Sequence, residues 1–162
     1  MSQTPIPNPN PRTLVTAIVL NYRSPRDTIR CIEALKKQTI AHDLSILLVD
    51  NHSEDESIAW LRARYNDDAM VRIIEQSKNT GYGRGNNAAL ARVQSEFLLI
   101  INPDNVLQEN GLERMLTVLR QRSDAAIVGP ALVYENGGIR SSARRFPNIL
   151  DLFHKRLFPQ RW

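Results

Sequence analysis

The sequence predicts an α/β fold in which a mostly parallel β-sheet is flanked by helices. Four short apolar runs are rich in Val, Ile and Leu without clean alternation, which is typical of strands buried on both faces. They cover residues 14–20, 45–49, 71–74 and 97–101. Their ends are roughly 25 to 29 residues apart, too far for hairpins. This spacing favours a strand, a crossover helix and the next parallel strand.

Helix-start signals lie between these runs. Ser24 to Asp27 combines a capping serine, a proline suited to the first helical position and an acid in the first turn, which predicts a helix over 25–38. Ser53 to Glu56 has the pattern of a capping box and predicts a second helix. Asn110 to Glu113 predicts another helix in the same way.

The end of the chain has a different pattern. A fifth strand is expected at 126–128, before Gly129 and Pro130. Residues 132–134 and 139–141 flank the turn residues Asn136, Gly137 and Gly138, which predicts an antiparallel hairpin.

The length of 162 residues, with 42% hydrophobic residues, is that of one ordinary globular domain. No apolar run approaches the ~18 residues that cross a bilayer. We expect a flexible proline-rich leader over 1–12, a folded domain over 13–146 and a basic amphipathic segment over 147–162 that begins a further, acceptor-side half. A short helix is expected within that segment, at 148–158. The single cysteine, Cys31, fits a cytoplasmic protein.

Polar residues follow each apolar run, at the edge of a parallel sheet where ligands bind. The first run leads to Asn21 and the second to Asp50 and Asn51, where a carboxylate can accept hydrogen bonds from a base or ribose. The alternative interpretation is that Asp50 has a structural role and satisfies backbone amides in a turn or helix cap. The third run leads to residues 79–87, where glycines let backbone approach a ligand and a following helix favours anions. This segment is not a G-x-G-x-x-G fingerprint, because residue 86 is asparagine.

The fourth run ends at Asn102, Pro103 and Asp104. Asp104 is placed to project from the edge of the sheet, where its carboxylate can bind a hard divalent cation shared with a diphosphate. The alternative interpretation is a simple Asn-Pro-Asp-Asn turn.

Together these segments resemble family-2 glycosyltransferases of the Rossmann-like GT-A fold, and most closely the rhamnosyltransferase-like members. The resemblance runs from about Leu14 to Phe146 through the motifs V-T-A-I-V-L-N-Y-R-S, L-L-V-D-N-H-S-E-D, N-T-G-Y-G-R-G-N-N and I-I-N-P-D-N. It implies that Asp50 contacts the nucleotide and that Asp104 is the final acid of the D-x-D element that binds Mg²⁺ or Mn²⁺. Asn102 stands in place of the first acid, which removes one charge from that element. The predicted nucleotide-sugar-binding residues are Asn21, Asp50, Asn51, Asn79, Gly81, Gly85, Asn86, Asn102 and Asp104.

The resemblance implies inverting transfer from a nucleoside-diphosphate sugar, with dTDP-rhamnose as the suggested donor. The acceptor would be a cell-surface glycan or a lipid-linked sugar, reached in the cytoplasm or by peripheral contact with the inner face of the membrane. The family's catalytic base lies beyond the region covered here, and neither Glu135 nor Asp151 is assigned that role. The alternative is a truncated or non-catalytic nucleotide-sugar-binding module. Nucleic acid is not expected as a partner, since no zinc-finger or aromatic-rich sheet signature is present.

Overall fold

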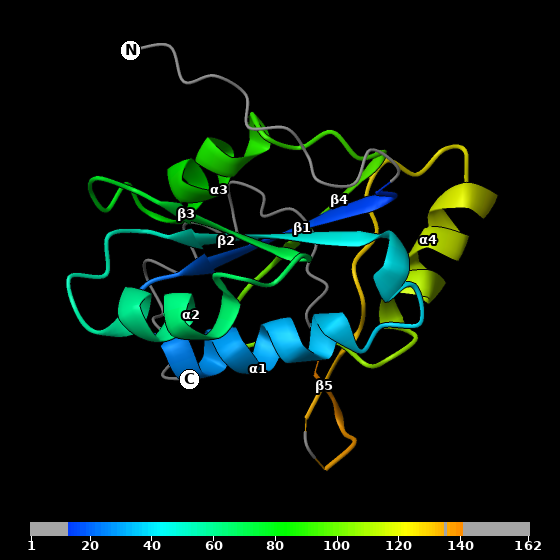
Figure 1. Cartoon of the computed structure of the whole chain (residues 1–162). Helices are drawn as coiled ribbons and strands as arrows, with labels where there is room; N and C mark the ends of the chain where they lie inside the picture. The colour runs from blue at the N-terminus through cyan, green and yellow to red at the C-terminus, as the bar shows by residue number, and fades with distance from the viewer. Residues whose placement is uncertain (1–12, 135, 141–162) are drawn as a thin grey trace, which may run out of the picture. The chain divides into compact units, whose positions relative to one another are not determined.

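The computed structural model describes residues 13–134 and 136–140, and the chain divides into two compact units, residues 1–126 and 127–162. The first unit alternates strands and helices, as the sequence predicts (Figure 1). Its elements are β1 (Val15–Asn21), α1 (Pro25–Lys36), a 3₁₀ turn (Ala41–Asp43), β2 (Leu44–Asp50), α2 (Ser57–Tyr65), β3 (Val71–Glu75), α3 (Tyr82–Leu90), β4 (Phe97–Ile101) and α4 (Gly111–Gln121). None of the helices in the described residues is long and apolar enough to cross a bilayer.

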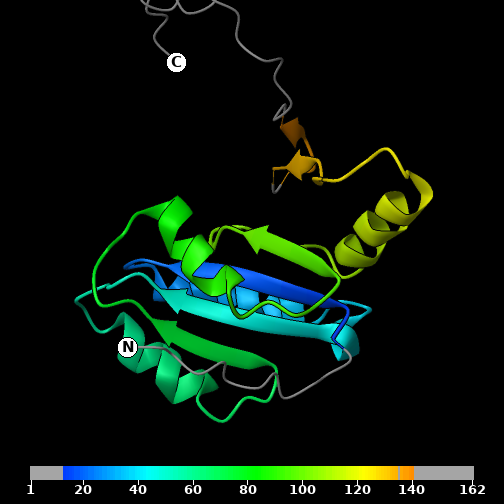
Figure 2. The ribbon, with the colours of Figure 1, turned by 90° about the horizontal axis from the view of Figure 1, so that it is seen from above.

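The four strands form one parallel sheet in the order β3-β2-β1-β4, which confirms the predicted α/β class (Figure 2). The register pairs Asn21 with Asp50, and Asp50 with Glu75. The carboxyl ends of β1, β2 and β3 therefore reach the same edge of the sheet. In Figure 1, α3 covers one face, and α1 and α2 cover the other.

Apolar side chains fill both interfaces between sheet and helices. On the face covered by α3, one buried cluster contains Ile18, Leu20, Leu47, Val49, Ile74 and Ala89. On the other face, α1 buries Cys31, Ile32 and Leu35. The helical spacing of these three residues places them on one side of α1, which packs against β1.

One edge of this sheet is less well covered. β4 pairs only with β1 among the described strands. The register sets Ile100 beside Ile18, so Leu98 and Ile100 lie on the α3 side of the sheet. Because α3 packs against β1 and β2, these two side chains remain 40% and 47% exposed.

One predicted helix start is wrong, and a second lacks the predicted cap hydrogen bond. The Ser53 to Glu56 capping box does not form: α2 begins at Ser57, with Glu56 before it and no side-chain cap. The Ser53 hydroxyl instead donates to Asp50 at 2.5 Å, while the Ser57 amide donates to the Asp55 carboxylate at 2.8 Å. The start of α4 after Asn110 is where the sequence predicts it, although Asn110 makes no side-chain cap hydrogen bond.

The predicted strand at 126–128 is also wrong, because these residues are irregular. Ile127 is 90% exposed, so this short apolar run has no partner among the described residues that would complete a ladder. The predicted hairpin is confirmed as β5 (Leu132–Val133) paired antiparallel with β6 (Ile139–Arg140). It forms a two-stranded sheet of its own, closed by Gly137 with a φ of 81°. The leader and the helix expected at 148–158 lie outside the described residues.

Gln38 ties the end of α1 to the start of α4. Its side chain is buried, and Nε2 donates to the carbonyl of Gln108 at 2.8 Å while Oε1 accepts from the amide of Leu112 at 3.0 Å. We expect Gln38→Ala to lower the free energy of unfolding by about 1 to 2 kcal/mol, because buried backbone groups lose their partners. Urea unfolding measures this change. The exposed Gln121→Ala serves as control and should change it by less than about 0.5 kcal/mol.

Candidate functional site

A cleft of about 470 Å³ opens at the carboxyl edge of the sheet. This volume lies within the range of small-molecule sites, about 300 to 1,000 Å³. The loops after β1, β2, β3 and β4 all contribute to its walls. Five of the nine predicted site residues line it, namely Asn51, Asn79, Gly81, Asn102 and Asp104. The structure therefore brings together residues that are up to 53 positions apart in the sequence, from Asn51 to Asp104.

The other four predicted residues do not line the cleft. Asn21 and Asp50 are 0% and 4% exposed, at the paired ends of β1 and β2. Asp50 Oδ1 accepts a hydrogen bond from Asn21 Nδ2 at 2.7 Å, and its Oδ2 accepts one from the Ser53 amide at 3.1 Å. Gly85 and Asn86 are buried in α3. These four residues are buried and do not contribute to the lining of the cleft.

Asn51 joins the end of β2 to the glycine-rich segment. Its Nδ2 donates to Asn79 Oδ1 at 2.9 Å, and its Oδ1 accepts from the Thr80 amide at 3.2 Å. Asn79 Oδ1 also accepts from the Gly81 amide at 2.9 Å. Gly81 has a φ of 78°, which a residue with a side chain rarely adopts. Side-chain amide hydrogen bonds thus link Asn51 and Asn79 to Gly81, where the positive φ favours glycine.

α3 begins at Tyr82, directly after Gly81, so the predicted loop over Gly83 and Gly85 is instead the first part of a helix. The first amides of a helix have no partner within the helix, and they favour an anion. Gly85 packs tightly, because a Cβ there would lie 2.8 Å from Cδ1 of Leu20. The side-chain Oδ1 of Asn86 is buried and has no hydrogen-bond partner among the described residues.

The turn after β4 carries Asp104 into the cleft. It is closed by a hydrogen bond from the Asn105 amide to the carbonyl of Asn102 at 3.1 Å. Cys31 lies beneath this turn, with its thiol 3.7 Å from the same carbonyl. Burial, with a smaller effect of the Asp104 charge, raises the pKa of Cys31 to about 12. Its thiol is therefore neutral at physiological pH and supports the turn without acting as a nucleophile.

The residues present fit a metal ion that is shared with a ligand. Within the described part of the chain, no group of three or more His, Cys, Asp or Glu side chains could hold an ion alone. The cleft nevertheless offers the carboxylates of Asp27 and Asp104 and the amide oxygen of Asn102. Mg²⁺ commonly takes one or two carboxylates and completes its shell with substrate phosphates and water.

Six residues that line the cleft are not among the nine predicted site residues: Leu20, Pro103 and the four with polar groups, Tyr22, Ser24, Asp27 and Tyr82. Tyr22 and Tyr82 are 40% and 51% exposed. A tyrosine immediately after a strand-end asparagine, and another immediately after a glycine at a helix start, are signals that could have identified them. An exposed ring at a sheet edge presents a flat apolar surface to a ligand.

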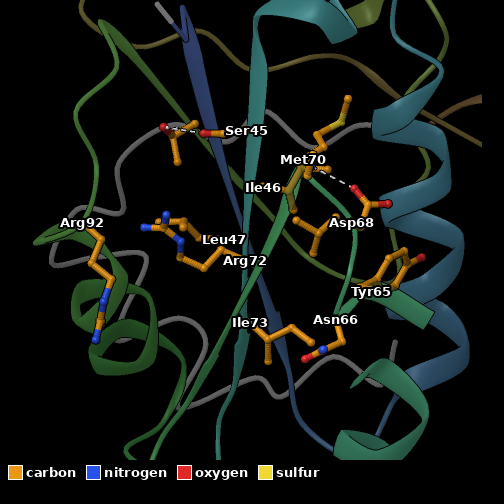
Figure 3. Close-up of a pocket in the computed structure, with 13 residues that line it drawn as sticks. Ser45, Ile46, Leu47, Tyr65, Asn66, Asp68, Met70, Arg72, Ile73 and Arg92 are labelled. Carbon is orange, nitrogen blue, oxygen red and sulfur yellow. Dashed lines mark hydrogen bonds between the residues drawn. The ribbon is translucent and has the colours of Figure 1, made fainter. Parts of the chain in front are cut away.

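A second cavity, of about 330 Å³, lies near the amino ends of β2 and β3. Figure 3 shows Ser45 and Met70 at these strand starts, with Tyr65 from the end of α2 and Asp68 from the connection between α2 and β3. None of the nine predicted site residues lines it. The carboxyl-edge cleft is therefore the candidate site.

Comparisons with known proteins identify the family and the fold of the chain. The model of the family "Glycosyl transferase family 2" matches residues 16–161. The chain is 25% identical to the glycosyltransferase GlyG of Streptococcus pneumoniae over 122 residues, which cover 75% of this chain and 40% of GlyG. The chain thus spans less than half the length of that relative.

Two solved structures share the fold. TarS 1-349 of S. aureus in complex with UDP-GlcNAc matches with a TM-score of 0.60 and 19% identity, over 75% of this chain and 38% of that one. The mannosyltransferase PcManGT of Pyrobaculum calidifontis, in complex with GDP-Man and Mn²⁺, matches with a TM-score of 0.61 and 19% identity, over 80% and 38%. Fold and family model agree, and the chain belongs to glycosyl transferase family 2.

Proposed function

We propose that this chain forms the nucleotide-sugar-binding part of an inverting glycosyltransferase. The observation that carries the proposal is the cleft at the carboxyl edge, where Asn51, Asn79 and Gly81 face Asp104 beside the start of α3. The nucleoside and the diphosphate of a nucleoside-diphosphate sugar each have matching groups in this cleft. Family membership and the nucleotide-sugar complexes of the structural neighbours support the assignment.

The nucleoside end would bind between Tyr22 and Asn51. The exposed Tyr22 ring offers a stacking surface for a base, and the Arg23 guanidinium lies 5.1 Å from the centre of that ring. Amide groups such as that of Asn51 both donate and accept hydrogen bonds, as the edges of a base or ribose require.

The diphosphate would bind between the start of α3 and Asp104. Backbone amides after Gly81 favour its negative charge. A Mg²⁺ or Mn²⁺ ion held by Asp104, with help from Asn102, would stabilise the leaving diphosphate when the bond to the sugar breaks. The Mn²⁺ complex of PcManGT supports divalent metal use at such a site.

The donor we propose is dTDP-rhamnose, on the strength of the sequence motifs, and the acceptor is a cell-surface glycan or a lipid-linked sugar at the inner face of the membrane. In the reaction, an acceptor hydroxyl attacks the anomeric carbon opposite the diphosphate while a base takes its proton. The carboxylates that line the cleft among the described residues are Asp27 and Asp104. The alternative function is a nucleotide-sugar-binding module without turnover.

Calorimetric titration with dTDP, UDP and GDP, each with and without Mn²⁺, tests donor binding. We expect at least one nucleotide to bind, and Asp104→Ala to remove the gain in affinity that Mn²⁺ gives. Asn51→Ala should weaken binding by about tenfold, the effect of losing one or two hydrogen bonds. Asp67→Ala, which removes an exposed carboxylate outside the cleft, is the control and should bind like the wild type. A folded protein that binds none of the three nucleotides would show the assignment to be wrong.

A further inference from the structure

The Asp50 carboxylate is the centre of a buried polar network. Asn21 Nδ2 donates to Asp50 Oδ1 at 2.7 Å and to Ser53 Oγ at 3.0 Å, and Ser53 Oγ donates to Asp50 Oδ1 at 2.5 Å. The Thr28 hydroxyl of α1 donates to Asn21 Oδ1 at 2.9 Å. All four residues are at most 4% exposed. The network therefore connects β1, β2 and α1 by contacts that water does not reach.

None of these four residues lines the cleft, but immediate neighbours of Asn21, Asp50 and Thr28 do. Tyr22 follows Asn21, and Asn51 follows Asp50. The hydrogen bonds of Asn21 and Asp50 therefore help to fix the positions of Tyr22 and Asn51. A carboxylate that already accepts three hydrogen bonds from protein groups has little capacity left for a ligand.

The two loops that carry Tyr22 and Asn51 are strained. Arg23, His52 and Glu54 have φ values of 55°, 62° and 54°, in the left-handed region that residues with a Cβ rarely adopt. Such conformations persist only where surrounding contacts hold them.

The contacts that hold this backbone converge on Ser53. Its hydroxyl accepts from the Arg23 amide at 3.1 Å, and its carbonyl accepts from Arg23 Nε at 2.9 Å. Glu54 adds an ion pair to Arg23 at 3.4 Å and a contact with His52 Nε2 at 3.2 Å, both between exposed side chains. Since exposed ion pairs contribute little, the buried bonds between Ser53, Asp50 and Asn21 are the main restraint.

We infer that Asp50 is a positioning residue: it acts through Asn21 and Ser53 to hold Tyr22 and Asn51 in place, and it does not touch the nucleotide. This inference rests on the proposed function, because it assigns the cleft to a nucleotide. It replaces the direct contact that the sequence motifs imply for Asp50. It also gives Ser53, which sequence reasoning treats as a helix cap, a role in ligand binding.

Amide hydrogen exchange in the ligand-free protein, combined with nucleotide titration, tests this inference. We expect Ser53→Ala and Asp50→Asn each to speed exchange at residues 22–24 and 51–54, and each to weaken nucleotide binding about tenfold or more. The double variant should lose no more affinity than the weaker-binding single variant, because both changes release the same network. Tyr22→Ala is the matched control: it should weaken binding while exchange at 51–54 stays unchanged.

Two results would overturn the inference. Affinity losses of Asp50→Asn and Ser53→Ala that add in the double variant would mean that Asp50 contacts the ligand independently. Unchanged exchange in Ser53→Ala would mean that the network does not hold the loops, and this result decides the matter even where Asp50→Asn fails to fold. A wild-type protein that binds no nucleotide contradicts the proposed function instead, and the exchange measurement still reports on the network.

Discussion

Sugar transfer by this 162-residue chain is expected to be about 10² to 10⁴-fold slower than transfer by a family member whose site includes a positioned base. Asp104, a metal ion and the start of α3 can orient the donor and stabilise the leaving diphosphate. Proton removal from the acceptor needs a further carboxylate. The cleft offers Asp27 among the described residues, and Asp27 also forms an ion pair with Arg30 at 3.8 Å between exposed side chains.

A radiolabelled transfer assay at equal donor saturation measures this difference. A titration must also show that the two proteins bind the donor equally well, so that a difference in rate reports on turnover. A transfer rate of this chain within tenfold of the rate of that family member would contradict the prediction. Asp27→Asn, Glu135→Gln and Asp151→Asn would then identify the base, although Glu135 and Asp151 lie outside the described residues.

Two glycines in the same helix should respond in opposite directions to a single methyl group. At Gly85, a Cβ would meet Leu20 Cδ1 at 2.8 Å and Asn51 Oδ1 at 3.4 Å. We expect Gly85→Ala to lower the free energy of unfolding by about 1 to 3 kcal/mol, as overpacking does. It should also weaken nucleotide binding, because Leu20 and Asn51 both line the cleft.

Gly83→Ala is the matched control, since a Cβ at Gly83 meets nothing within 4 Å. Alanine is the better helix former, so this change should raise the free energy of unfolding by about 0.5 kcal/mol. Urea unfolding of both variants, with calorimetry for binding, measures the pair. Equal effects at the two positions would contradict the close packing of α3 on β1.

The strands could be predicted because their signal is local. Each of the four parallel strands is a dense apolar run, and the structure places all four within one or two residues of the expected bounds. The starts of α1 and α4 were predicted as well, but the start of α2 depended on a contact that the sequence does not display. Ser53 has the spacing of a cap, but the Asp50 carboxylate three residues earlier takes its hydroxyl. Helix α2 therefore begins later than the pattern predicts.

From the sequence, the candidate site could be predicted to lie at the carboxyl edge of the sheet. Polar residues after strands identified the right loops, but which side chain faces the cleft depends on strand pairing. Asn21 and Asp50 are opposite each other in the register and bond across it, so they turn away from the cleft while Asn51 lines it. That pairing is a contact over 29 positions, from Asn21 to Asp50, which local pattern cannot reveal.

Among the described residues, one edge of β4 has no partner strand, and this has a practical consequence for the protein in solution. An edge strand presents unsatisfied amides and carbonyls to any other strand, and natural proteins blunt such edges with charges, prolines or bulges. The β4 sequence, Phe-Leu-Leu-Ile-Ile, carries no charge and no proline. Short segments of this composition are typical of aggregation-prone sequences. Of the described strands, β4 is the one through which concentrated samples would self-associate, and a lysine at Leu98 is the direct remedy.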